Sequence, residues 1–505
     1  MKIRLDKDAS KPLYQQIVDQ VRQQILSGEL LPGYRLPPER RLSESLGINR
    51  TTVLNAYREL KAENLIDSHV GQGTVVLPHS SVNDEMDHTI PQEPIWNHYF
   101  SAYSNRFDPH IINDLLNLAN RSDMISFATG IASPECGPLE IFHGIEQEIL
   151  AEKNSQSLLH SPVEGFTSLR NVLRTYMEKR GCYLNTDEVM ILAGSQQGID
   201  LVARVLLDPG DIVVVEEPTF FPALQVFRST GARVMGVPVD DEGMQVDVLE
   251  QLLQRYHPKF LYTIPTFHNP CGVEMTLERR RRLIELVHKY KLLVLEDDAY
   301  GELCYDHPPL PTLKSMDTGG FVLYMSTFSK IIYPGLRIGW LVAHKKMIQR
   351  LAAVRQTVDL HTNCLSQRLV ERFISGGRQD LHLKKICKEY AQRRDIMLDA
   401  LTRCAPPGVS WEMPHGGYYV WCRLPDGVSA ARLLAKAAEY KVVFVPGNSF
   451  FLSDQGDHFI RLNFTFASKP DITRGIQLLC DAIRALQKEA PAVSSEPFMD
   501  LSPIV

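Results

Sequence analysis

The chain has 505 residues, a formal net charge of −6, and 44% hydrophobic and 23% charged residues. At roughly 150 residues per domain this length predicts about three folding units, and the composition excludes collagen-like, coiled-coil and wholly disordered proteins. Apolar runs such as residues 321–325 fall far short of the about 20 residues that cross a bilayer, and the N-terminus lacks the apolar segment of a secretory signal. We therefore expect neither a membrane nor a secretory role.

The cysteines and the charge distribution further limit the classes of protein to which this chain can belong. The nine cysteines are scattered, with no CxxC pair and no Cys/His spacing that suits zinc, so we expect no metal site and a reducing, cytoplasmic location. Residues 1–78 carry 11 Lys and Arg against 9 Asp and Glu, whereas the whole chain has 54 against 60. The N-terminal end is the only part with a basic bias.

The first three predicted elements are helices. Residues 12–27 place apolar side chains four positions apart between a proline and a glycine, which predicts an amphipathic helix with both end signals. A second helix is predicted within residues 36–46, and Asn49 is expected to cap a third, because Asn is a preferred N-cap residue. The second and third helices have the spacing of a helix-turn-helix.

Two predicted strands, residues 65–68 and 74–77, follow these helices around a glycine-containing turn and form a β-hairpin wing. Residues 1–77 are therefore predicted to fold as an α+β winged helix-turn-helix domain, called the head below. Residues 78–94 change to Ser, Asn, Pro and acids without Lys or Arg. This composition predicts a flexible linker with an end-to-end distance of roughly 22 Å.

The rest of the chain, called the body below, is predicted to be α/β. Apolar strand-like runs alternate with helical segments from about residue 120, which is typical of a mostly parallel sheet. The body is assigned to residues 95–488, with a large domain and a smaller C-terminal domain, and residues 489–505 to a mobile tail. Aromatic side chains at helical spacing between residues 96 and 107 predict a helix docked on the body. The predicted strands are residues 189–192, 212–215, 260–264, 292–295 and 321–325.

The third predicted helix has the features of a DNA-reading helix. Residues 35–58 contain five arginines and two glutamates, and Arg50, Thr51 and Thr52 lie at the helix N-terminus. That end meets base edges and phosphates in helix-turn-helix docking. Composition alone leaves a protein–protein module as an alternative, and the two threonines could simply cap the helix.

Four segments of the head closely resemble the GntR-type winged-helix regulators. These segments are residues 12–17, 36–42, 49–53 and 71–74. The resemblance implies that the head binds double-stranded DNA. Carried over position by position, it implies DNA contacts by Arg40, Arg50, Thr51, Thr52 and the wing residue Gly73.

Lys330 lies among hydroxyl side chains and is followed seven residues later by Arg337. A pyridoxal phosphate site needs such a set. The lysine amine forms the Schiff base with the aldehyde, while Thr327, Ser329 and Arg337 offer donors and a permanent charge to the phosphate. An isolated lysine is usually solvated, so the prediction depends on these neighbours.

Two further segments offer groups for the pyridine ring. The strand at residues 292–295 delivers Asp297 and Tyr300 to the sheet edge where α/β proteins bind ligands. Asp297 can keep the pyridine nitrogen protonated, and Tyr300 can hydrogen-bond the ring 3-hydroxyl oxygen. Asn269 is expected to be the second donor to that oxygen, although Asn-Pro is also a turn signal.

The phosphate is expected at a helix N-terminus, because free N–H groups and the helix dipole favour an anion there. Ser195 and Gln196 begin a predicted helix directly after a strand. Phe220 is placed to stack on the ring, with an ordinary core aromatic as the alternative. Arg461 lies in an apolar strand pattern, where a lone guanidinium is costly to bury without an anion such as an amino acid's carboxylate.

These segments together resemble the fold-type I aminotransferases, most closely those acting on aminoadipate and kynurenine, over nearly all of residues 95–488. The resemblance depends on Gly-Ser-Gln-Gln-Gly, Asn-Pro-x-Gly, Asp-Asp-Ala-Tyr, Ser-Lys and Arg-Leu-Asn in this order. Phe220 departs from a common Tyr, which puts a hydrogen bond from that position in doubt. The resemblance implies that Ser195, Gln196, Thr327, Ser329 and Arg337 hold phosphate, Asn269, Asp297 and Tyr300 tune the ring, Lys330 is the Schiff-base lysine, and Arg461 holds a substrate carboxylate.

A GntR-type head fused to an aminotransferase-like body resembles the MocR subfamily of bacterial transcription regulators. The resemblance implies a regulator that binds pyridoxal 5'-phosphate as an internal aldimine, senses an amine, an amino acid or the cofactor itself, and forms a homodimer through the body. The alternative is an active aminotransferase whose DNA-binding head only tunes its own expression. Lys330 and Arg461 are compatible with both, so turnover, effector, operator and the sign of regulation stay open.

Overall fold

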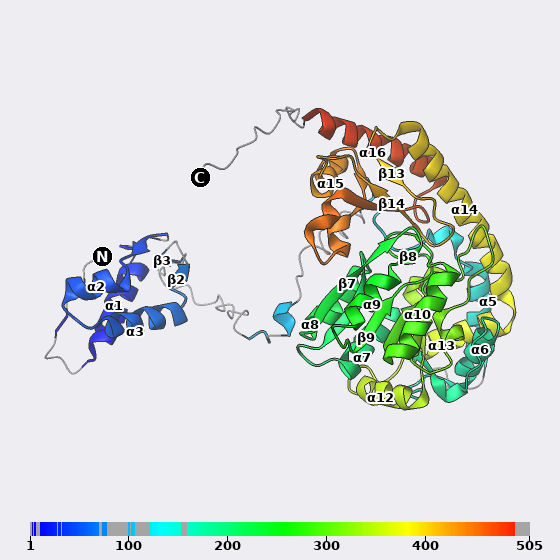
Figure 1. The fold of residues 1–505 in the computed structure, drawn as a ribbon, viewed down its shortest axis with the longest axis horizontal. Helices are drawn as coiled ribbons and strands as arrows, with labels where there is room; N and C mark the ends of the chain where they lie inside the picture. Colours follow the sequence, from blue (N-terminus) through cyan, green and yellow to red (C-terminus); the bar gives the residue numbers. More distant parts are fainter. Residues whose placement is uncertain are drawn as a thin grey trace, which may run out of the picture. The chain divides into compact units, whose positions relative to one another are not determined.

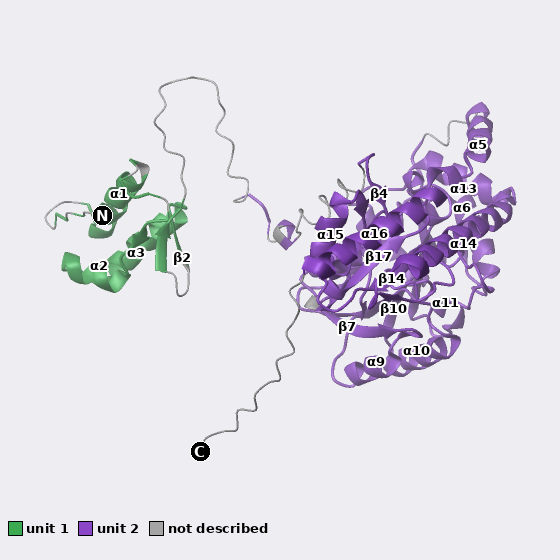
Figure 2. Cartoon of the chain, turned by 90° about the horizontal axis from the view of Figure 1, so that it is seen from above, with its two compact units in different colours: residues 1–98 green, residues 99–505 purple. Residues whose placement is uncertain are grey.

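The computed structural model divides into two compact units, residues 1–98 and 99–505 (Figure 2). The predicted linker at residues 78–94 and the tail from residue 490 lie outside the residues that the structure describes. The described residues are 3, 5–6, 11–27, 29–31, 33–69, 73–77, 99–101, 103–106, 121–152 and 159–489 (Figure 1).

The described part of the head contains three helices and a three-stranded antiparallel sheet of order β1-β3-β2. Strands β2 and β3 pair from Ile66 opposite Val76 to His69 opposite Gly73 and form the predicted hairpin. The winged helix-turn-helix prediction is confirmed. The elements are α1 (Leu13–Leu26), β1 (Arg35–Leu36), α2 (Glu39–Leu46), α3 (Arg50–Ala62), β2 (Ile66–His69) and β3 (Gly73–Val76).

Local signals in the head fix the turn and expose one end of α3. Gly47 ends α2 with a φ of 62°, a left-handed conformation that favours glycine. The side chain of Asn49 accepts a hydrogen bond from the backbone N–H of Thr51 at 3.0 Å, as predicted for the N-cap. Val53 and Leu60 are fully buried against α1, so the polar N-terminus of α3 stays at the surface.

The body is built on an eight-stranded sheet of order β5-β12-β11-β10-β9-β6-β7-β8. β10 pairs in parallel with both β9 and β11, which confirms the mostly parallel sheet. β12 is antiparallel to both of its neighbours, and it was not among the predicted strands. The strands are β5 (Val189–Leu192), β6 (Ile212–Glu217), β7 (Arg233–Asp240), β8 (Gly243–Met244), β9 (Phe260–Thr263), β10 (Leu293–Asp297), β11 (Val322–Thr327) and β12 (Gly339–Val342).

Helices cover both faces of this sheet because its buried strands are apolar on both sides. Val213 and Val215 of β6 belong to a core shared with α7 (Ser195–Leu206), α8 (Phe221–Ser229) and α12 (Lys345–Arg355). Val214 faces the other way. Its core is shared with α9 (Val246–Leu253), α10 (Leu277–Tyr290) and α11 (Leu313–Met316).

A second, antiparallel sheet of order β13-β14-β17-β16 forms the C-terminal part, as predicted for a smaller C-terminal domain. Its strands are β13 (Ser410–Trp411), β14 (Tyr419–Arg423), β16 (Val445–Pro446) and β17 (Phe459–Asn463). The long helix α14 packs along α16 beside it (Figure 1). Among the described residues, the remaining α-helices and a two-stranded pair are α5 (Leu139–Ala151), α6 (Thr167–Glu178), α13 (Cys364–Ser375), α14 (Arg378–Cys404), α15 (Ala430–Glu439), α16 (Lys469–Glu489), β4 (Ile125–Ser126) and β15 (Val442–Val443).

The aromatic segment at residues 96–107, at the start of the body, differs from its prediction. Of the segment's described residues, only Ser104–Arg106 are helical, and they form a single 3-10 turn. Tyr99 is 75% exposed and Phe100 is 50% exposed. Aromatic spacing alone therefore did not specify a helix here, because Tyr99 and Phe100 remain at least half exposed and most helical stability comes from packing an apolar face. Across the described part of the chain, no helix is long and apolar enough to cross a membrane.

Candidate functional site

A cavity of about 330 Å³ lies beyond the carboxyl end of β10 in the body. Segments that are far apart in the sequence build its walls, and the cavity brings together every residue that the sequence assigned to the cofactor or the effector. These residues are Ser195, Gln196, Phe220, Asn269, Asp297, Tyr300, Thr327, Ser329, Lys330, Arg337 and Arg461.

Lys330 lies in a 3-10 turn directly after β11 and reaches back across the cavity. Its Nζ donates a hydrogen bond to the carbonyl oxygen of Gly130 at 2.6 Å. Burial lowers the pKa of this amine, and the nearby Arg461 and Arg337 lower it further. A lowered pKa raises the fraction of neutral amine, which is the nucleophilic form.

Asp297 is the last residue of β10 and is almost fully buried. Its Oδ2 accepts a hydrogen bond from the Tyr262 hydroxyl at 2.8 Å, while its Oδ1 is buried without a partner among the described residues. Burial raises the pKa of this carboxyl to about 7. An unpaired buried acceptor costs roughly 1–3 kcal/mol, so this side of the cavity suits a ligand that donates a hydrogen bond.

Arg461 of β17 is 4% exposed, and among the described residues its guanidinium donates hydrogen bonds only to neutral groups. Its Nη1 donates to Asn269 Oδ1 at 2.8 Å and its Nη2 to the carbonyl oxygen of Ala128 at 3.2 Å. The Nε is buried without a partner in the described structure. The guanidinium carbon lies 4.1 Å from the centre of the Tyr419 ring. A buried cation in this setting favours an anionic ligand.

The other end of the cavity is rich in hydrogen-bond donors. α7 begins at Ser195, and its N-cap residue, Gly194, offers no side chain to occupy the first N–H groups. Arg337 Nη2 donates to the Ala193 carbonyl at 2.9 Å. A Cβ atom on Gly194, whose φ is 95°, would lie 2.6 Å from that nitrogen, so a glycine is required. Helix N–H groups beside a guanidinium suit a phosphate.

The hydroxyls of Thr327 and Ser329 lie at the same end. The Thr327 hydroxyl donates to Ser329 Oγ at 2.9 Å, and the backbone N–H of Ser329 donates to Thr327 Oγ1 at 3.1 Å. Both side chains are buried. Their mutual hydrogen bonds hold the turn that carries Lys330 and orient the hydroxyls in the cavity wall.

Two tyrosines in the site escaped the sequence analysis. The Tyr300 hydroxyl donates to the Tyr419 hydroxyl at 3.1 Å, and Tyr419 also lines the cavity. Burial alone would raise the pKa of Tyr419, but Arg461 and Lys330 together lower it below its usual value. The other missed tyrosine is Tyr262, which holds Asp297. Their only sequence signal is a polar ring tip within an apolar strand pattern, which does not reveal its partner.

In the head, the residues assigned to DNA lie at or near the surface. Arg40 is 83% and Arg50 67% exposed, and they pair with Glu44 at 3.1 Å and Glu39 at 3.2 Å. Because Asn49 caps α3, the hydroxyls of Thr51 and Thr52 are not needed as caps.

Gly73 begins β3 with a φ of 83°, and no atom lies within 4 Å of where its Cβ would be. Glycine is therefore favoured there by backbone conformation and not by crowding. The neighbouring wing residues 70–72 lie outside the described residues. No group of three or more His, Cys, Asp or Glu within the described ranges is placed to hold a metal ion.

Comparison with known proteins matches both units. Residues 122–479 match the family "Aminotransferase class I and II", and residues 13–76 match "Bacterial regulatory proteins, gntR family". Aromatic-amino-acid aminotransferase 1 of Thermococcus litoralis is 42% identical over 77% of this chain and 95% of its own length. The HTH-type transcriptional regulator YisV of Bacillus subtilis is 31% identical over 94% of this chain and 96% of its own.

A solved structure shares the fold of the body. It is the α-aminoadipate aminotransferase LysN of Thermus thermophilus in complex with N-(5'-phosphopyridoxyl)-L-leucine. It is 36% identical, with a TM-score of 0.74 over 78% of this chain and 100% of that one. A helix-turn-helix head joined to such a body defines a transcription regulator with an aminotransferase-like domain. The chain belongs to the aminotransferase class I and II family and, through its head, to the gntR family of bacterial regulatory proteins, the combination found in the MocR subfamily.

Proposed function

We propose that this regulator binds pyridoxal 5'-phosphate in the body, and that an amine, an amino acid or the cofactor itself acts there as the signal that changes how the head holds operator DNA in the cytoplasm. One observation carries the proposal. A partly buried amine, a buried carboxylate with one oxygen that no described residue pairs, and a buried guanidinium that contacts only neutral groups among the described residues line one cavity. The cofactor has an aldehyde for the amine and a ring nitrogen for the carboxylate, and an amino acid has a carboxylate for the guanidinium.

Different residues of the cavity would hold different parts of the cofactor. Asp297 would pair its free Oδ1 with the ring nitrogen, and Phe220 would lie against the ring. Because Asn269 Oδ1 accepts from Arg461, its NH2 group is left to donate to the ring oxygen beside Tyr300. When bound, the cofactor supplies an aldehyde that joins primary amines and a ring that withdraws electrons. The phosphate would be held by Ser195, Gln196, Thr327, Ser329 and Arg337.

The effector would place its carboxylate at Arg461, which lies across the cavity from the phosphate end. The presence of N-(5'-phosphopyridoxyl)-L-leucine in LysN supports room for an amino acid beside the cofactor. We also propose that the chain forms a homodimer through the body, so that two heads meet paired DNA half-sites. A linker with a reach of roughly 22 Å would allow direct or inverted half-sites.

The cofactor part is tested by borohydride reduction of the purified protein followed by peptide mapping. The label is expected on Lys330 alone, and Lys330→Ala should bind the cofactor without a reducible linkage. Lys346→Ala, which changes a lysine of α12 outside the cavity, is the matched control and should keep the label. A label on another lysine would refute the assignment.

The regulatory part is tested by linkage between the two units. If the effector changes operator affinity by some factor, operator DNA must change effector affinity by the same factor. Titrating each in the presence and absence of the other measures both factors. The alternative is an active aminotransferase that shares a chain with a DNA-binding head. It would be favoured if neither ligand changed the affinity for the other and the protein catalysed multiple turnovers on a panel of amino donors.

A further inference from the structure

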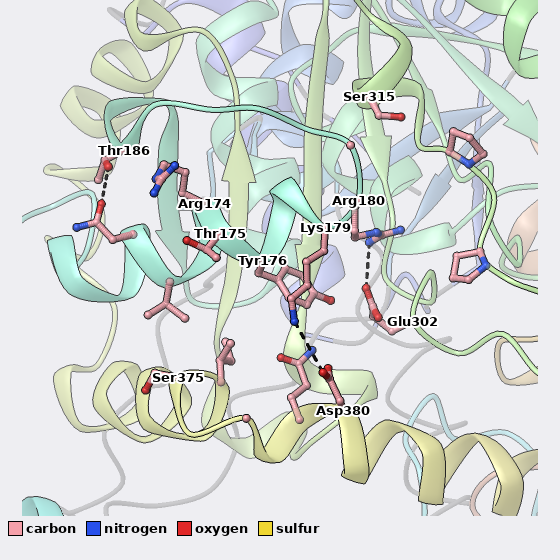
Figure 3. A pocket seen from close by; sticks show the side chains of 18 of the residues that line it. Arg174, Thr175, Tyr176, Lys179, Arg180, Thr186, Glu302, Ser315, Ser375 and Asp380 are labelled. Atoms are coloured by element: carbon pink, nitrogen blue, oxygen red, sulfur yellow. Dashed lines mark hydrogen bonds and ion pairs between the residues drawn. The ribbon is translucent and has the colours of Figure 1, made fainter.

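The body contains a second and larger cavity, of about 1270 Å³, which shares no lining residue with the cofactor cavity. Its walls come from the C-terminal half of α6, the following turn at residues 179–181, residues 309–316, and the junction of α13 and α14 (Figure 3). The functional assignment above uses none of these residues.

One short segment separates the two cavities. Asp297 and Tyr300 line the cofactor cavity, whereas Glu302 lines the second one. Between them, Asp298 is fully buried and forms an ion pair with Arg180 of the second cavity at 2.7 Å. Arg180 also faces Glu302 at 3.5 Å (Figure 3).

The wall around Glu302 carries an excess of negative charge. Arg180 is shared between two carboxylates, those of Asp298 and Glu302. The other cations of the cavity are already paired, since Arg174 pairs with Glu178 and Lys179 lies 3.7 Å from Asp380. Glu302 is 23% exposed, so it is accessible to a ligand and only partly screened by water. This wall favours an ammonium group.

The wall at the start of α14 offers an unpaired hydrogen-bond donor, and the carboxylate of Asp380 in the same turn lies 3.7 Å from the ammonium group of Lys179. Gln379 is 3% exposed, and its Nε2 is buried without a hydrogen-bond partner among the described residues. This donor stands in the first turn of α14, whose N-cap Gly377 provides no capping side chain. Unpaired N–H groups at a helix N-terminus favour an anion, and a buried amide donor without an acceptor is costly. A hydrogen-bond acceptor on a ligand could pair with the Gln379 amide and with the N–H groups at the start of α14.

We propose that this second cavity binds a small zwitterion, an amino acid whose ammonium group faces Glu302 and whose carboxylate faces Gln379 and the N-terminus of α14. The apolar side chains of Leu310, Met316 and Ile374 also line the cavity and would cover the carbon chain. The site goes beyond the proposed function, because no cofactor takes part in it.

The test is calorimetric titration of full-length Arg461→Ala protein that has been reduced with borohydride. In this protein the cofactor cavity has lost its carboxylate-binding guanidinium, and any linked cofactor can no longer exchange with an amine. The probes are L-leucine and 5-aminopentanoate, which differ in the spacing of their charges. Pentylamine and pentanoate each carry only one of the two charges.

At least one of the two zwitterions is expected to bind at one molecule per chain, and the stronger of them reports the preferred spacing. The single-charge analogues should bind about tenfold more weakly or worse, because each leaves one wall unpaired. Adding Glu302→Gln or Gln379→Leu should weaken the zwitterion by about tenfold. Glu285→Gln, which changes a 66% exposed carboxylate of α10, is the matched control and should have no effect.

The inference would be overturned if neither zwitterion bound, or if pentylamine bound as tightly as the zwitterions. It would also be overturned if neither Glu302→Gln nor Gln379→Leu changed the affinity. The variants are nearly isosteric, and Arg180 keeps its pair with Asp298 in each. If one variant fails to fold, the other and the analogue series still decide. If the chain bound no pyridoxal phosphate but showed these effects, the proposed function would be refuted and this second site supported. If it bound pyridoxal phosphate but showed none of these effects, this second site would be refuted and the proposed function would be unaffected.

Discussion

Arg40 and Arg50 of the head are held in the opposite way to Arg461 of the cofactor cavity. Arg40 and Arg50 are 83% and 67% exposed and pair with glutamates at the surface, where such pairs contribute about 0–1 kcal/mol. Arg461 is 4% exposed and contacts only neutral groups. DNA phosphates can replace the surface glutamates at little cost, whereas the buried guanidinium requires a ligand of matching shape.

The two units therefore suit different kinds of ligand. The head offers exposed cations at and near a helix end, which suits a long polyanion. The body offers fixed, desolvated groups, which suit one small molecule. The two kinds of site should therefore respond differently to mutation, pH and salt.

The largest effect is expected from Arg461→Ala. Truncating one member of a buried charge pair costs about 2–5 kcal/mol, so L-leucine should lose that much affinity, measured by titrating the cofactor absorbance. The amine 3-methylbutylamine, which has no carboxylate, should be little affected. Arg423→Ala, at a 62% exposed position of β14, is the control. Equal losses for the acid and the amine would show that Arg461 does not bind the carboxylate.

The buried carboxyl groups of the body should make its free energy of unfolding depend on pH. The pKa of Asp297 is raised from 3.8 to about 7 by burial, so between these values the folded cofactor-free body holds a proton that the unfolded chain releases. Stability should therefore fall as pH rises from about 4 to 7, by up to about 1.4 kcal/mol per pH unit. Glu296, whose pKa burial also raises to about 7, adds in the same direction.

Urea unfolding of the body at several pH values, followed by tryptophan fluorescence, measures this slope. Asp297→Asn should remove the contribution of Asp297 to the slope of the free energy of unfolding against pH, and the contribution of Glu296 should remain. Bound cofactor should do the same, because a protonated ring nitrogen keeps the carboxylate ionised. A slope that neither change alters would contradict the buried-carboxylate assignment.

In the head, Arg50→Ala should weaken operator binding by about 1–3 kcal/mol if the side chain reads a base. If it contacts a phosphate, the salt slope of log K should instead fall by about 1. Binding titrations at several salt concentrations separate these cases. The cofactor absorbance should not change, and an unchanged operator affinity would remove Arg50 from the interface.

The smallest effect is expected from Asn49→Ala. Loss of the side-chain cap on α3 should destabilise the head by about 1 kcal/mol, seen as a lower midpoint of its thermal transition. Operator affinity should fall in the same variant, because the N-terminus of α3 carries Arg50 and Thr51. Asn49→Asp keeps the cap and should restore stability, which makes it the matched control.

Much of the candidate site could be predicted because its signals are local. A capping residue, a glycine with positive φ, or a carboxylate at the end of an apolar strand can be recognised from a few neighbouring positions. The start of α7, the position of Asp297 at the end of β10 and the cap at Asn49 all follow from such short patterns. Residues predicted from separate motifs then met in one cavity.

Other features depend on which segments pack together, and no short pattern records that. Tyr419 enters the site because β14 pairs with β17, which places Tyr419 opposite Asn463 and Trp421 opposite Arg461. Tyr262 reaches Asp297 through the pairing of β9 with β10. In the second cavity, Arg180, Glu302 and Gln379 come from three distant segments. Short sequence patterns specify the local elements and the chemical groups they carry. Which groups meet depends on tertiary packing, because burial periodicity encodes the buried face of an element and not the identity of its partner.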